Sequence, residues 1–410
     1  MRLSGALADR DFRWLWAGQT ISAVGDGLFT VAIAALIVEA GGGAAELGLV
    51  LAGKALSLVV FVLIGGVLAD RVSRTKVMIG ADSVRALATV AVAIVGADAS
   101  IGVIAALTFV IGGGEAFFRP AYLSLVPRIL PAELIQSGNS IGALSVQAAA
   151  LGGPALAGIL IVAASPSVAL LIDAATFLLS LLTLLLVRER RVAEGREADG
   201  PAERSGAVAE ALAGLRAVRE RFWIGAVILL AMSHLLILIG PLDVLLPIIA
   251  EQELGGIDRF GALLAVFGAG AIVGALVCAR IRPRLPGVYA MVGVMPLGVL
   301  MFALAGPAPI WVVGAVFFAA GAGEQIFSVL WTTGVQRDVP DALLGRVFSL
   351  DYLGSLGLLP LGLALAGPVS DLIGREALLI GSGSFAILTS AAILVSPQVR
   401  AFSSRPEAAG

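Results

Sequence analysis

The stretch GGGEAFFRPAYLSLVPRILPAEL, residues 112–134, has a counterpart further along the chain. Residues 321–343, GAGEQIFSVLWTTGVQRDVPDAL, follow the same pattern at an offset of 209 residues. The identical pairs at this offset are Gly112 and Gly321, Gly114 and Gly323, Glu115 and Glu324, Phe118 and Phe327, Val126 and Val335, Arg128 and Arg337, Pro131 and Pro340, and Leu134 and Leu343. The chain is therefore expected to contain two halves built on one plan, with an acid at the same place in each.

Apolar composition decides the fold class. Hydrophobic residues make up 59% of the chain, charged residues 14%, and the mean hydropathy is +1.01, which is more apolar than a water-soluble domain of this length. Segments of about 20 apolar residues, the length that crosses a bilayer, recur throughout. The twelve segments expected to span the membrane are 13–38, 46–69, 76–97, 101–121, 136–163, 167–187, 222–249, 260–280, 287–306, 309–332, 346–366 and 375–396.

These segments predict an all-α membrane protein with twelve transmembrane helices in two six-helix bundles. The N-terminal bundle is expected over residues 1–187 and the C-terminal bundle over 222–398. Between them, the polar residues 188–221 are expected to form a cytoplasmic linker, and residues 399–410 a cytoplasmic tail. Two parallel six-helix repeats are the plan of transporters whose substrate path runs between the halves.

The positions of basic residues predict the orientation, because Lys and Arg accumulate in short cytoplasmic loops. With both termini inside, 24 of the 27 basic residues are assigned to cytoplasmic loops or cytoplasmic helix ends, and Lys54, Arg259 and Arg375 fall elsewhere. Lys54 is expected to extend outward along its helix toward water. The apolar segment after Arg13 is too long for a signal-peptide core and is expected to remain as the first helix.

Several chemistries are disfavoured by what the sequence contains. Cys278 is the only cysteine and His234 the only histidine, which excludes an intrachain disulfide and disfavours a metal site built on these residue types. No phosphate-binding loop of the pattern G-x4-GK[ST] is present, which excludes direct ATP hydrolysis by that motif. We therefore expect no cofactor, no nucleic-acid partner and no enzymatic activity.

A motif after the second predicted helix points to a family. The stretch GGVLADRVSRTKV contains Gly66, Asp70, Arg71, Arg74 and Lys76 in the pattern G-x3-D-R-x2-R-x-K. It resembles the signature of the major facilitator superfamily, although Ser73 stands where that signature has a second glycine. The resemblance implies a gating motif in which Asp70 faces the positive end of a helix that begins near Arg346. Orientation charge alone would explain the basic residues but neither Gly66 nor Asp70.

The fifth predicted helix carries a second resemblance. Its stretch ALGGPALAGIL contains Gly153, Pro154 and Gly158, similar to the glycine-proline motif of antiporters in the superfamily. Small residues that only pack helices together are the alternative. The blocks GEAFFRPAYLSLVP and QRDVPDALLGRVFSL resemble the drug:proton antiporter branch, which includes enterobactin exporters and macrolide efflux proteins.

Polar side chains at helical spacing indicate a hydrated cavity. In the first helix Gln19, Ser22, Asp26 and Thr30 recur at steps of three and four residues and share one face. The fifth helix carries Gln136, Ser140 and Gln147 in the same manner. These faces are expected to line the transport cavity; polar contacts that join packed helices are the alternative.

The two glutamates of the repeat are expected to differ. Glu115 has Arg119 one turn later, near the expected cytoplasmic end of its helix, and either forms a static pair with it or exchanges partners with Arg71 and Arg74 as part of a gate. Glu324 has Ser328 at the matching place and the aromatic residues Phe327 and Trp331 nearby. An acid without a cation in the membrane is the better candidate for reversible protonation, so Glu324 is the expected proton carrier.

Together these features predict a secondary transporter of the bacterial inner membrane, with both termini in the cytoplasm. It is expected to export an amphipathic small molecule, such as a drug, macrolide or siderophore, in exchange for protons and by alternating access. A proton-coupled importer of a small metabolite is one alternative. A membrane sensor that transports nothing is another, although the chain has no sizeable soluble output domain. The expected partners are the substrate, protons and the lipid bilayer, and the expected state is a monomer.

Overall fold

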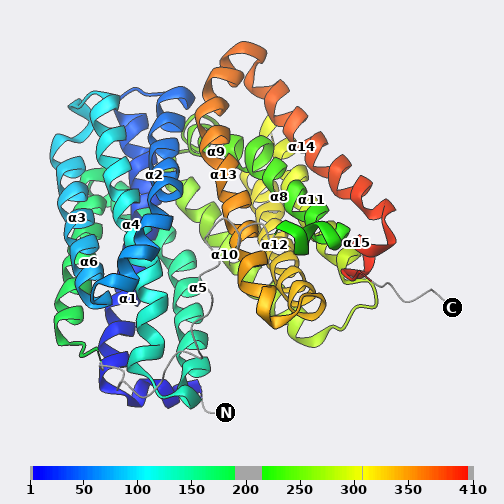
Figure 1. Cartoon of the computed structure of the whole chain (residues 1–410). Helices are drawn as coiled ribbons and strands as arrows, with labels where there is room; N and C mark the ends of the chain where they lie inside the picture. Colours follow the sequence, from blue (N-terminus) through cyan, green and yellow to red (C-terminus); the bar gives the residue numbers. More distant parts are fainter. Residues whose placement is uncertain (1–2, 190–214, 307, 405–410) are drawn as a thin grey trace. The chain divides into compact units, whose positions relative to one another are not determined.

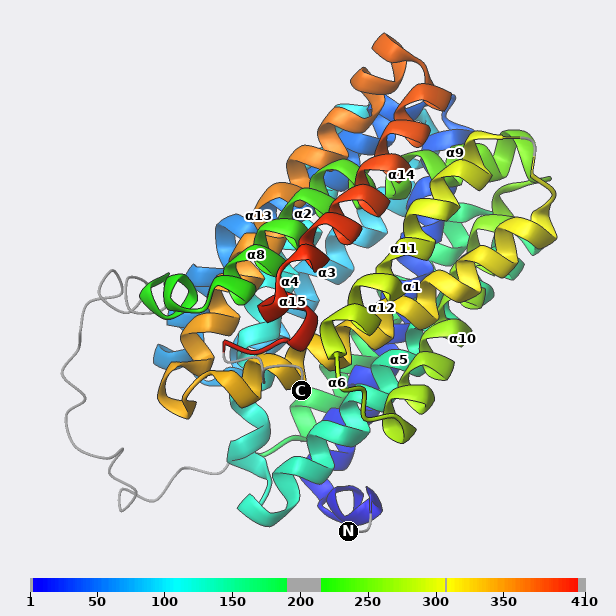
Figure 2. The ribbon, with the colours of Figure 1, turned by 90° about the vertical axis from the view of Figure 1, so that its right-hand side faces the viewer.

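The structure, a computed structural model, describes residues 3–189, 215–306 and 308–404. Within those ranges it does not describe the side chains of residues 3, 4, 63, 66, 67, 69–71, 132, 136, 341, 342, 345, 346, 349, 352, 353, 355 and 356. The described chain consists of helices joined by short connections, without a β-strand, as Figures 1 and 2 show. This confirms the predicted all-α class.

The first part of the chain forms six long helices. Their bounds, with two short 3-10 turns, are η1 Leu3–Ala8, α1 Arg10–Glu39, α2 Ala44–Arg71, α3 Arg74–Val95, η2 Gly96–Asp98, α4 Ile101–Ile129, α5 Ala132–Ala163 and α6 Pro166–Leu186. Local sequence sets several of the starts. Asp9 caps α1 by accepting hydrogen bonds from the backbone N–H groups of Asp11 and Phe12, at 2.9 and 3.1 Å. Ser165 caps α6 in the same way and is followed by Pro166 in the first turn, where proline is well tolerated.

The later part of the chain continues in the same manner. Its elements are α8 Phe222–His234, η3 Leu235–Ile239, α9 Gly240–Glu253, α10 Ile257–Arg280, α11 Pro286–Ala305, α12 Ile310–Asp338, α13 Asp341–Ile373, α14 Arg375–Ala392, η4 Ile393–Val395 and α15 Pro397–Ala401. The π-helical turn η3 joins α8 to α9, so that Phe222–Glu253 forms one membrane-spanning segment. Gly374, at φ +89°, forms the junction between α13 and α14, a backbone conformation that glycine adopts without strain.

The spanning helices match the predicted count. Among the described residues, eleven helices are long and apolar enough to cross a membrane, and α13 adds a shorter apolar stretch, Gly357–Ile373. Several helices run past the expected bounds, and α4 continues past residue 121 to Ile129 with Pro120 and Pro127 inside it. Proline is tolerated in membrane helices, where neighbouring groups satisfy the backbone that it leaves unpaired.

The chain divides into two compact units. Unit 1 comprises Met1–Arg196 with Leu246–Ala265, and unit 2 comprises Glu197–Leu245 with Val266–Gly410. Unit 1 thus includes the second part of α9 and the first turns of α10 in addition to the first six long helices. The expected division into two six-helix halves at a linker over 188–221, of which residues 190–214 lie outside the described chain, stays a prediction.

Glycines bring the helices of unit 1 close together. In this unit α1 packs against α5 and α6, α2 against α4, and α3 against both α4 and α6. Gly18 and Gly25 lie two turns apart on α1, and a Cβ atom at either would overlap side chains of α6. A Cβ atom on Gly65 of α2 would lie 2.5 Å from the carbonyl oxygen of Ala116 on α4. These contacts depend on the missing side chains, since only small residues allow backbones to approach so closely.

An aromatic core holds one end of unit 2 together. The Trp223 ring of α8 stacks on Phe402 with centroids 5.0 Å apart and meets Trp331 of α12 edge-on at 5.5 Å. Trp223, Trp331 and Phe402 are all buried. The residues after α14 are therefore packed into the unit as far as the described chain extends, although residues 399–410 were expected to form a tail.

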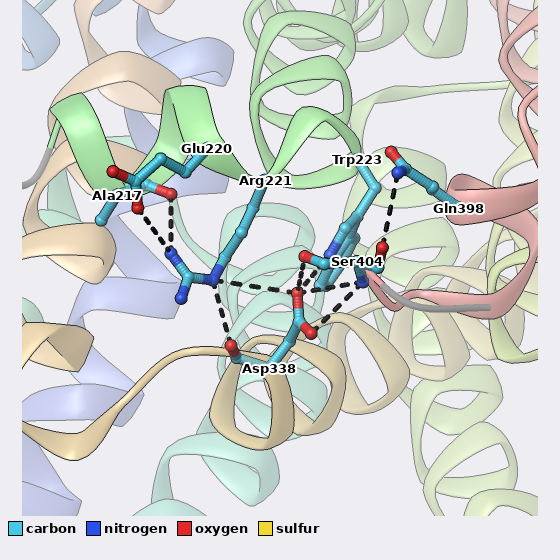
Figure 3. Close-up of polar contacts among 7 residues, drawn as sticks. All are labelled: Ala217, Glu220, Arg221, Trp223, Asp338, Gln398 and Ser404. Carbon is cyan, nitrogen blue, oxygen red and sulfur yellow. Dashed lines mark hydrogen bonds and ion pairs between the residues drawn. The ribbon is translucent and has the colours of Figure 1, made fainter. Parts of the chain in front are cut away.

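Polar contacts around Asp338 fasten this end, as Figure 3 shows. The indole N–H of Trp223 donates to the Asp338 carboxylate at 2.8 Å, and the Arg221 guanidinium donates to the Asp338 carbonyl oxygen at 3.0 Å. The backbone N–H and the hydroxyl of Ser404 donate to the same carboxylate. Asp338, the last residue of α12, thus joins the start of α8 to the segment that follows α15.

Gly323 provides a direct test of the backbone packing in unit 2. A Cβ atom there would overlap the backbone of Gly293 on α11, whereas Gly314 on the same helix has nothing within 4 Å. We expect Gly323→Ala to destabilise the protein by about 1–3 kcal/mol, the usual cost of overpacking. Thermal unfolding in detergent measures the effect, with Gly314→Ala as the matched control. Equal melting temperatures for the two variants would contradict this packing.

Candidate functional site

Six charged side chains lie in the middle of helices of unit 1. They are Asp26 on α1, Lys54 on α2, Asp82 and Arg85 on α3, Glu115 on α4 and Asp173 on α6. Glu115 shows their depth, because α4 has fourteen residues on either side of it. At about 1.5 Å per residue it lies about 21 Å from each helix end, well inside a hydrocarbon core about 30 Å thick. We refer to these six residues as the charge cluster.

Arg85 is the centre of the charge cluster. Its guanidinium forms an ion pair with Asp26 of α1 through Nη2 and Oδ1, and its Nη1 lies 3.8 Å from Oδ1 of Asp82, one turn earlier on α3. The planar group also lies over the ring of Phe177 on α6, 4.0 Å from the centroid. Arg85 thus connects three helices through electrostatic contacts.

Lys54 and Glu115 form a second pair in the charge cluster. Nζ of Lys54 lies 3.5 Å from Oε2 of Glu115 and 5.0 Å from the ring centroid of Phe29 on α1. The expectation that Lys54 extends outward to water is therefore wrong, because the ammonium finds a carboxylate and an aromatic face within the unit. Arg119, an exposed residue one turn after Glu115, adds to the positive potential at Glu115.

The positions of Glu115 and Arg85 along their helices correct two further expectations. Glu115 lies at the midpoint of α4 rather than near its end, because the helix continues through Pro120 and Pro127. Arg85 was assigned to a cytoplasmic loop or helix end, yet it is the twelfth of the 22 residues of α3 and is buried. The distance of Arg85 from the start of its helix was the sequence feature that could have indicated its depth. Counting basic residues to assign the orientation does not use that distance.

The charge cluster has an open part and a closed part. The side chains of Asp26, Lys54 and Glu115 are 43%, 25% and 29% exposed. The side chain of Arg85 is 3% exposed, and Asp82 and Asp173 are fully buried. Both carboxylate oxygens of Asp82 and of Asp173, and Nε of Arg85, have no hydrogen-bond partner in the described protein. Buried polar groups without partners are rare and costly.

The residues expected to line a cavity have more than one role in the structure. The Gln19 amide donates to the hydroxyl of Ser180 on α6 at 3.1 Å, and Ser22 is buried. Asp26 belongs to the charge cluster and is partly exposed. Gln147 on α5 is exposed. Gln19 therefore joins two packed helices, while Asp26 reaches an open face of the unit.

The gating motif is described only in part. The surroundings of Gly66 and the side chains of Asp70, Arg71 and Arg346 are not among those that the structure describes. Arg74 pairs with Glu189 at 3.5 Å, and the Ser73 hydroxyl donates to the same carboxylate at 2.8 Å, while Lys76 is exposed. Arg128 at the end of α4 lies 4.0 Å from Glu189. Glu189 was missed because it falls at the start of the polar segment that was interpreted as a solvated linker.

The small residues of α5 make close contacts within unit 1. A Cβ atom on Gly153 would lie 2.8 Å from the Cα of Gly27 on α1. One on Gly158 would lie 3.1 Å from the carbonyl oxygen of Asp258 at the start of α10, and the Pro154 carbonyl oxygen lies against Gly261. The antiporter-like motif is therefore a place where three helices of this unit meet closely.

In unit 2, Glu324 has the same depth as Glu115, with fourteen residues of α12 on either side. Within the described part of this unit, no ion pair or hydrogen bond is formed by its carboxylate. Trp331, two turns later, is buried and donates its indole N–H to Asp351 of α13 at 3.1 Å. Trp331 thus lies in the aromatic core, whereas Glu324 lies beside Gly323, where α12 and α11 touch.

A family model described as transmembrane secretion effector, within the major facilitator superfamily, matches residues 4–409. The chain belongs to this family. It is a multi-pass membrane transporter related to efflux proteins and not an enzyme, which confirms the resemblance found in its motifs.

Curated relatives match nearly the whole chain. Macrolide efflux protein A of Streptococcus pyogenes is 23% identical over 382 residues, which are 92% of this chain and 93% of that protein. The multidrug efflux pump Tap of Mycobacterium tuberculosis is 26% identical over 408 residues, or 95% and 94% of the two chains. The enterobactin exporter EntS of Escherichia coli is 25% identical over 405 residues, or 96% and 94%.

Solved structures share the fold at lower identity. The nucleoside transporter NupG superposes with a TM-score of 0.71 and 14% identity, covering 94% of this chain and 98% of that one. A mutant of the peptide transporter POT gives 0.73 and 17%, covering 96% and 95%. The likeness confirms the predicted twelve-helix transporter fold.

The Lys54–Glu115 pair can be tested by a double-mutant cycle. We expect Lys54→Met alone to destabilise the protein more than Lys54→Met combined with Glu115→Gln, because the single change leaves a carboxylate without its cation. A coupling free energy of about 1 kcal/mol is expected for a partly exposed pair. Unfolding in detergent gives the four values. Arg119→Met in place of Lys54→Met is the comparison, and a larger coupling there would show that Arg119 is the main partner of Glu115.

Proposed function

We propose that the protein exports an amphipathic small molecule across the bacterial inner membrane in exchange for protons, by alternating access of its two halves. The observation that carries the proposal is that the two repeated glutamates, Glu115 and Glu324, have different surroundings. Both lie at the midpoint of a membrane helix, but Glu115 has Lys54 at 3.5 Å, whereas Glu324 has no ionic partner in the described part of unit 2. The two acids therefore suit different tasks.

Glu324 suits the binding and release of a proton. An ionised carboxylate is costly in an apolar environment unless a cation or several hydrogen bonds compensate it. Without such partners Glu324 is best accommodated as the neutral acid, and it loses its proton when water or a charged substrate group reaches it. Protonation that depends on access couples proton movement to a change of conformation.

Glu115 suits a role in gating. Its charge is already compensated by Lys54, and Arg119 adds positive potential, so it has little reason to exchange protons. An ion pair between α2 and α4 can open and close as these helices move. Arg74, a residue of the gating motif at the start of α3, and Arg128 at the end of α4 both lie beside Glu189. We assign the cytoplasmic gate to this region together with Gly66, Asp70, Arg71, Lys76 and Arg346.

The direction and substrate class rest on the relatives. Proteins named for the efflux of macrolides, of multiple drugs and of enterobactin each match more than nine-tenths of this chain. Their named substrates support a medium-sized organic molecule, and their names support export. The distribution of basic residues supports an orientation with both termini in the cytoplasm.

Transport by two glutamate variants tests the assignment. In proteoliposomes given radiolabelled macrolide from outside, Glu324→Gln is expected to abolish accumulation driven by an acidic interior. Counterflow into vesicles preloaded with unlabelled macrolide is expected to continue, because it needs no net proton movement. Glu115→Gln is expected to slow both processes, because it alters a gate. Ser328→Ala, one turn from Glu324 on α12, is the matched control and should behave as the wild type. Full gradient-driven accumulation by Glu324→Gln would refute its role as the proton carrier.

A further inference from the structure

The charge cluster contains more carboxylates than cations. Lys54 compensates Glu115, which leaves Asp26, Asp82 and Asp173 around the single guanidinium of Arg85. If all three aspartates were ionised, three negative charges and one positive charge would leave two uncompensated charges inside unit 1. Uncompensated charge in a low-dielectric interior is avoided by neutralisation. Two of the three aspartates must therefore be neutral for the site to carry no net charge.

Burial favours Asp82 and Asp173 as the two neutral aspartates. Asp82 and Asp173 are fully buried, and none of their four carboxylate oxygens has a hydrogen-bond partner in the described protein. One hydroxyl group lies beside each of these aspartates. Ser180 lies beside Asp82 and accepts a hydrogen bond from Gln19 at 3.1 Å. Thr176 donates to the backbone carbonyl oxygen of Asp173 at 2.7 Å.

Asp26 differs from the other two aspartates. Its side chain is 43% exposed, and its carboxylate forms the ion pair with Arg85. Arg85 carries five N–H donors in a rigid planar group, so a small movement changes which carboxylate it faces. Nη1 is already 3.8 Å from Asp82, and Nε has no hydrogen-bond partner in the described protein. Arg85 is therefore placed to exchange Asp26 for a buried aspartate.

We propose that Asp26, Asp82 and Asp173 form a second proton-binding site, which holds two protons around Arg85 and exchanges them with water through Asp26. The internal step transfers one proton from Asp82 or Asp173 to Asp26, while the guanidinium moves from Asp26 to the newly ionised aspartate. Only O–H bonds are broken and formed, and the net charge of the site is zero before and after. Asp26, the exposed aspartate of the three, then releases the proton to water or takes one up from it.

The surroundings of the site favour protons over a metal ion. No group of three acidic, histidine or cysteine side chains suited to hold a metal occurs among the residues that the structure covers. The guanidinium at the centre would also repel a cation. Around it, α2 and α4 present Lys54 and Glu115, which neutralise each other, and α6 presents Asp173. The described side chains of α5 include one acid, Glu133, which lies in the first turn of the helix and is exposed.

Infrared difference spectroscopy of the detergent-solubilised protein tests this proposal without any substrate. A protonated carboxyl gives a C=O stretch that is resolved from ionised carboxylates and shifts in D₂O. At neutral pH we expect Asp82→Asn and Asp173→Asn each to remove one such band from the wild-type spectrum. We also expect Asp26→Asn to remove one, although Asp26 itself is ionised, because Arg85 then pairs with a buried aspartate and that residue loses its proton.

The Asp26→Asn result separates the proposal from a purely structural role. If Asp82 and Asp173 were permanently neutral packing groups, Asp26→Asn would leave both bands in place, and this outcome would overturn the proposal. Unchanged spectra in Asp82→Asn and Asp173→Asn would overturn it as well. Asn keeps the size of the neutral acid, so the variants are suited to fold, and Asp98→Asn at an exposed turn is the control that should leave the bands unchanged.

The inference deepens the proposed function, and a transport measurement distinguishes the failure of each. Asp173→Asn is expected to reduce gradient-driven macrolide accumulation at least tenfold while Glu324 remains intact. If the infrared bands behave as expected but the wild-type protein shows no transport driven by a proton gradient, the proton site stands and proton-coupled export fails. If Glu324→Gln uncouples transport and the bands do not respond, the export proposal stands and the second site fails.

Discussion

The guanidinium of Arg85 is the constraint on which the first unit depends. A permanent positive charge in the middle of a membrane helix is stable only where carboxylates and a polarisable ring surround it. Asp26, Asp82 and Phe177 meet this need from α1, α3 and α6. The glycines of α1 allow α6 to come close enough, since a Cβ atom on Gly25 would overlap the Asp173 carboxylate. The compensation of the Arg85 charge therefore depends on the close packing of α1 against α6.

The repeat explains why the two units carry different chemistry on the same plan. Gly114 and Glu115 match Gly323 and Glu324, and both pairs lie at helix midpoints. A Cβ atom on Gly114 would lie 2.6 Å from Cγ of Arg85, whereas Gly323 faces the backbone of Gly293. In the first unit, the glycine before Glu115 therefore packs against α3, which carries Arg85. In the second unit, the glycine before Glu324 packs against the backbone of α11. An internal duplication that later lost or gained charges would produce this asymmetry.

Sequence alone predicted the twelve helices, the repeat and the family, because each depends on composition or on spacing along one segment. It failed where contacts depend on how helices are rotated against each other. Lys54 turns toward Glu115 and Phe29, which no pattern within α2 reveals. Arg85 lies eleven residues after Arg74, about 16 Å along α3, and that depth rather than its charge was the available signal. Glu189 showed no signal, because an acid in a polar segment resembles any solvated residue.

The central claim is that carboxylates inside the membrane make this transporter exchange protons for its substrate. The most direct measurement places the wild-type protein in weakly buffered proteoliposomes with a pH-sensitive dye inside and imposes a macrolide gradient with no initial pH difference. The account predicts that the macrolide flux drives protons in the opposite direction, seen as a change of internal pH that empty liposomes do not show. Macrolide movement through the protein with no change of internal pH would contradict it.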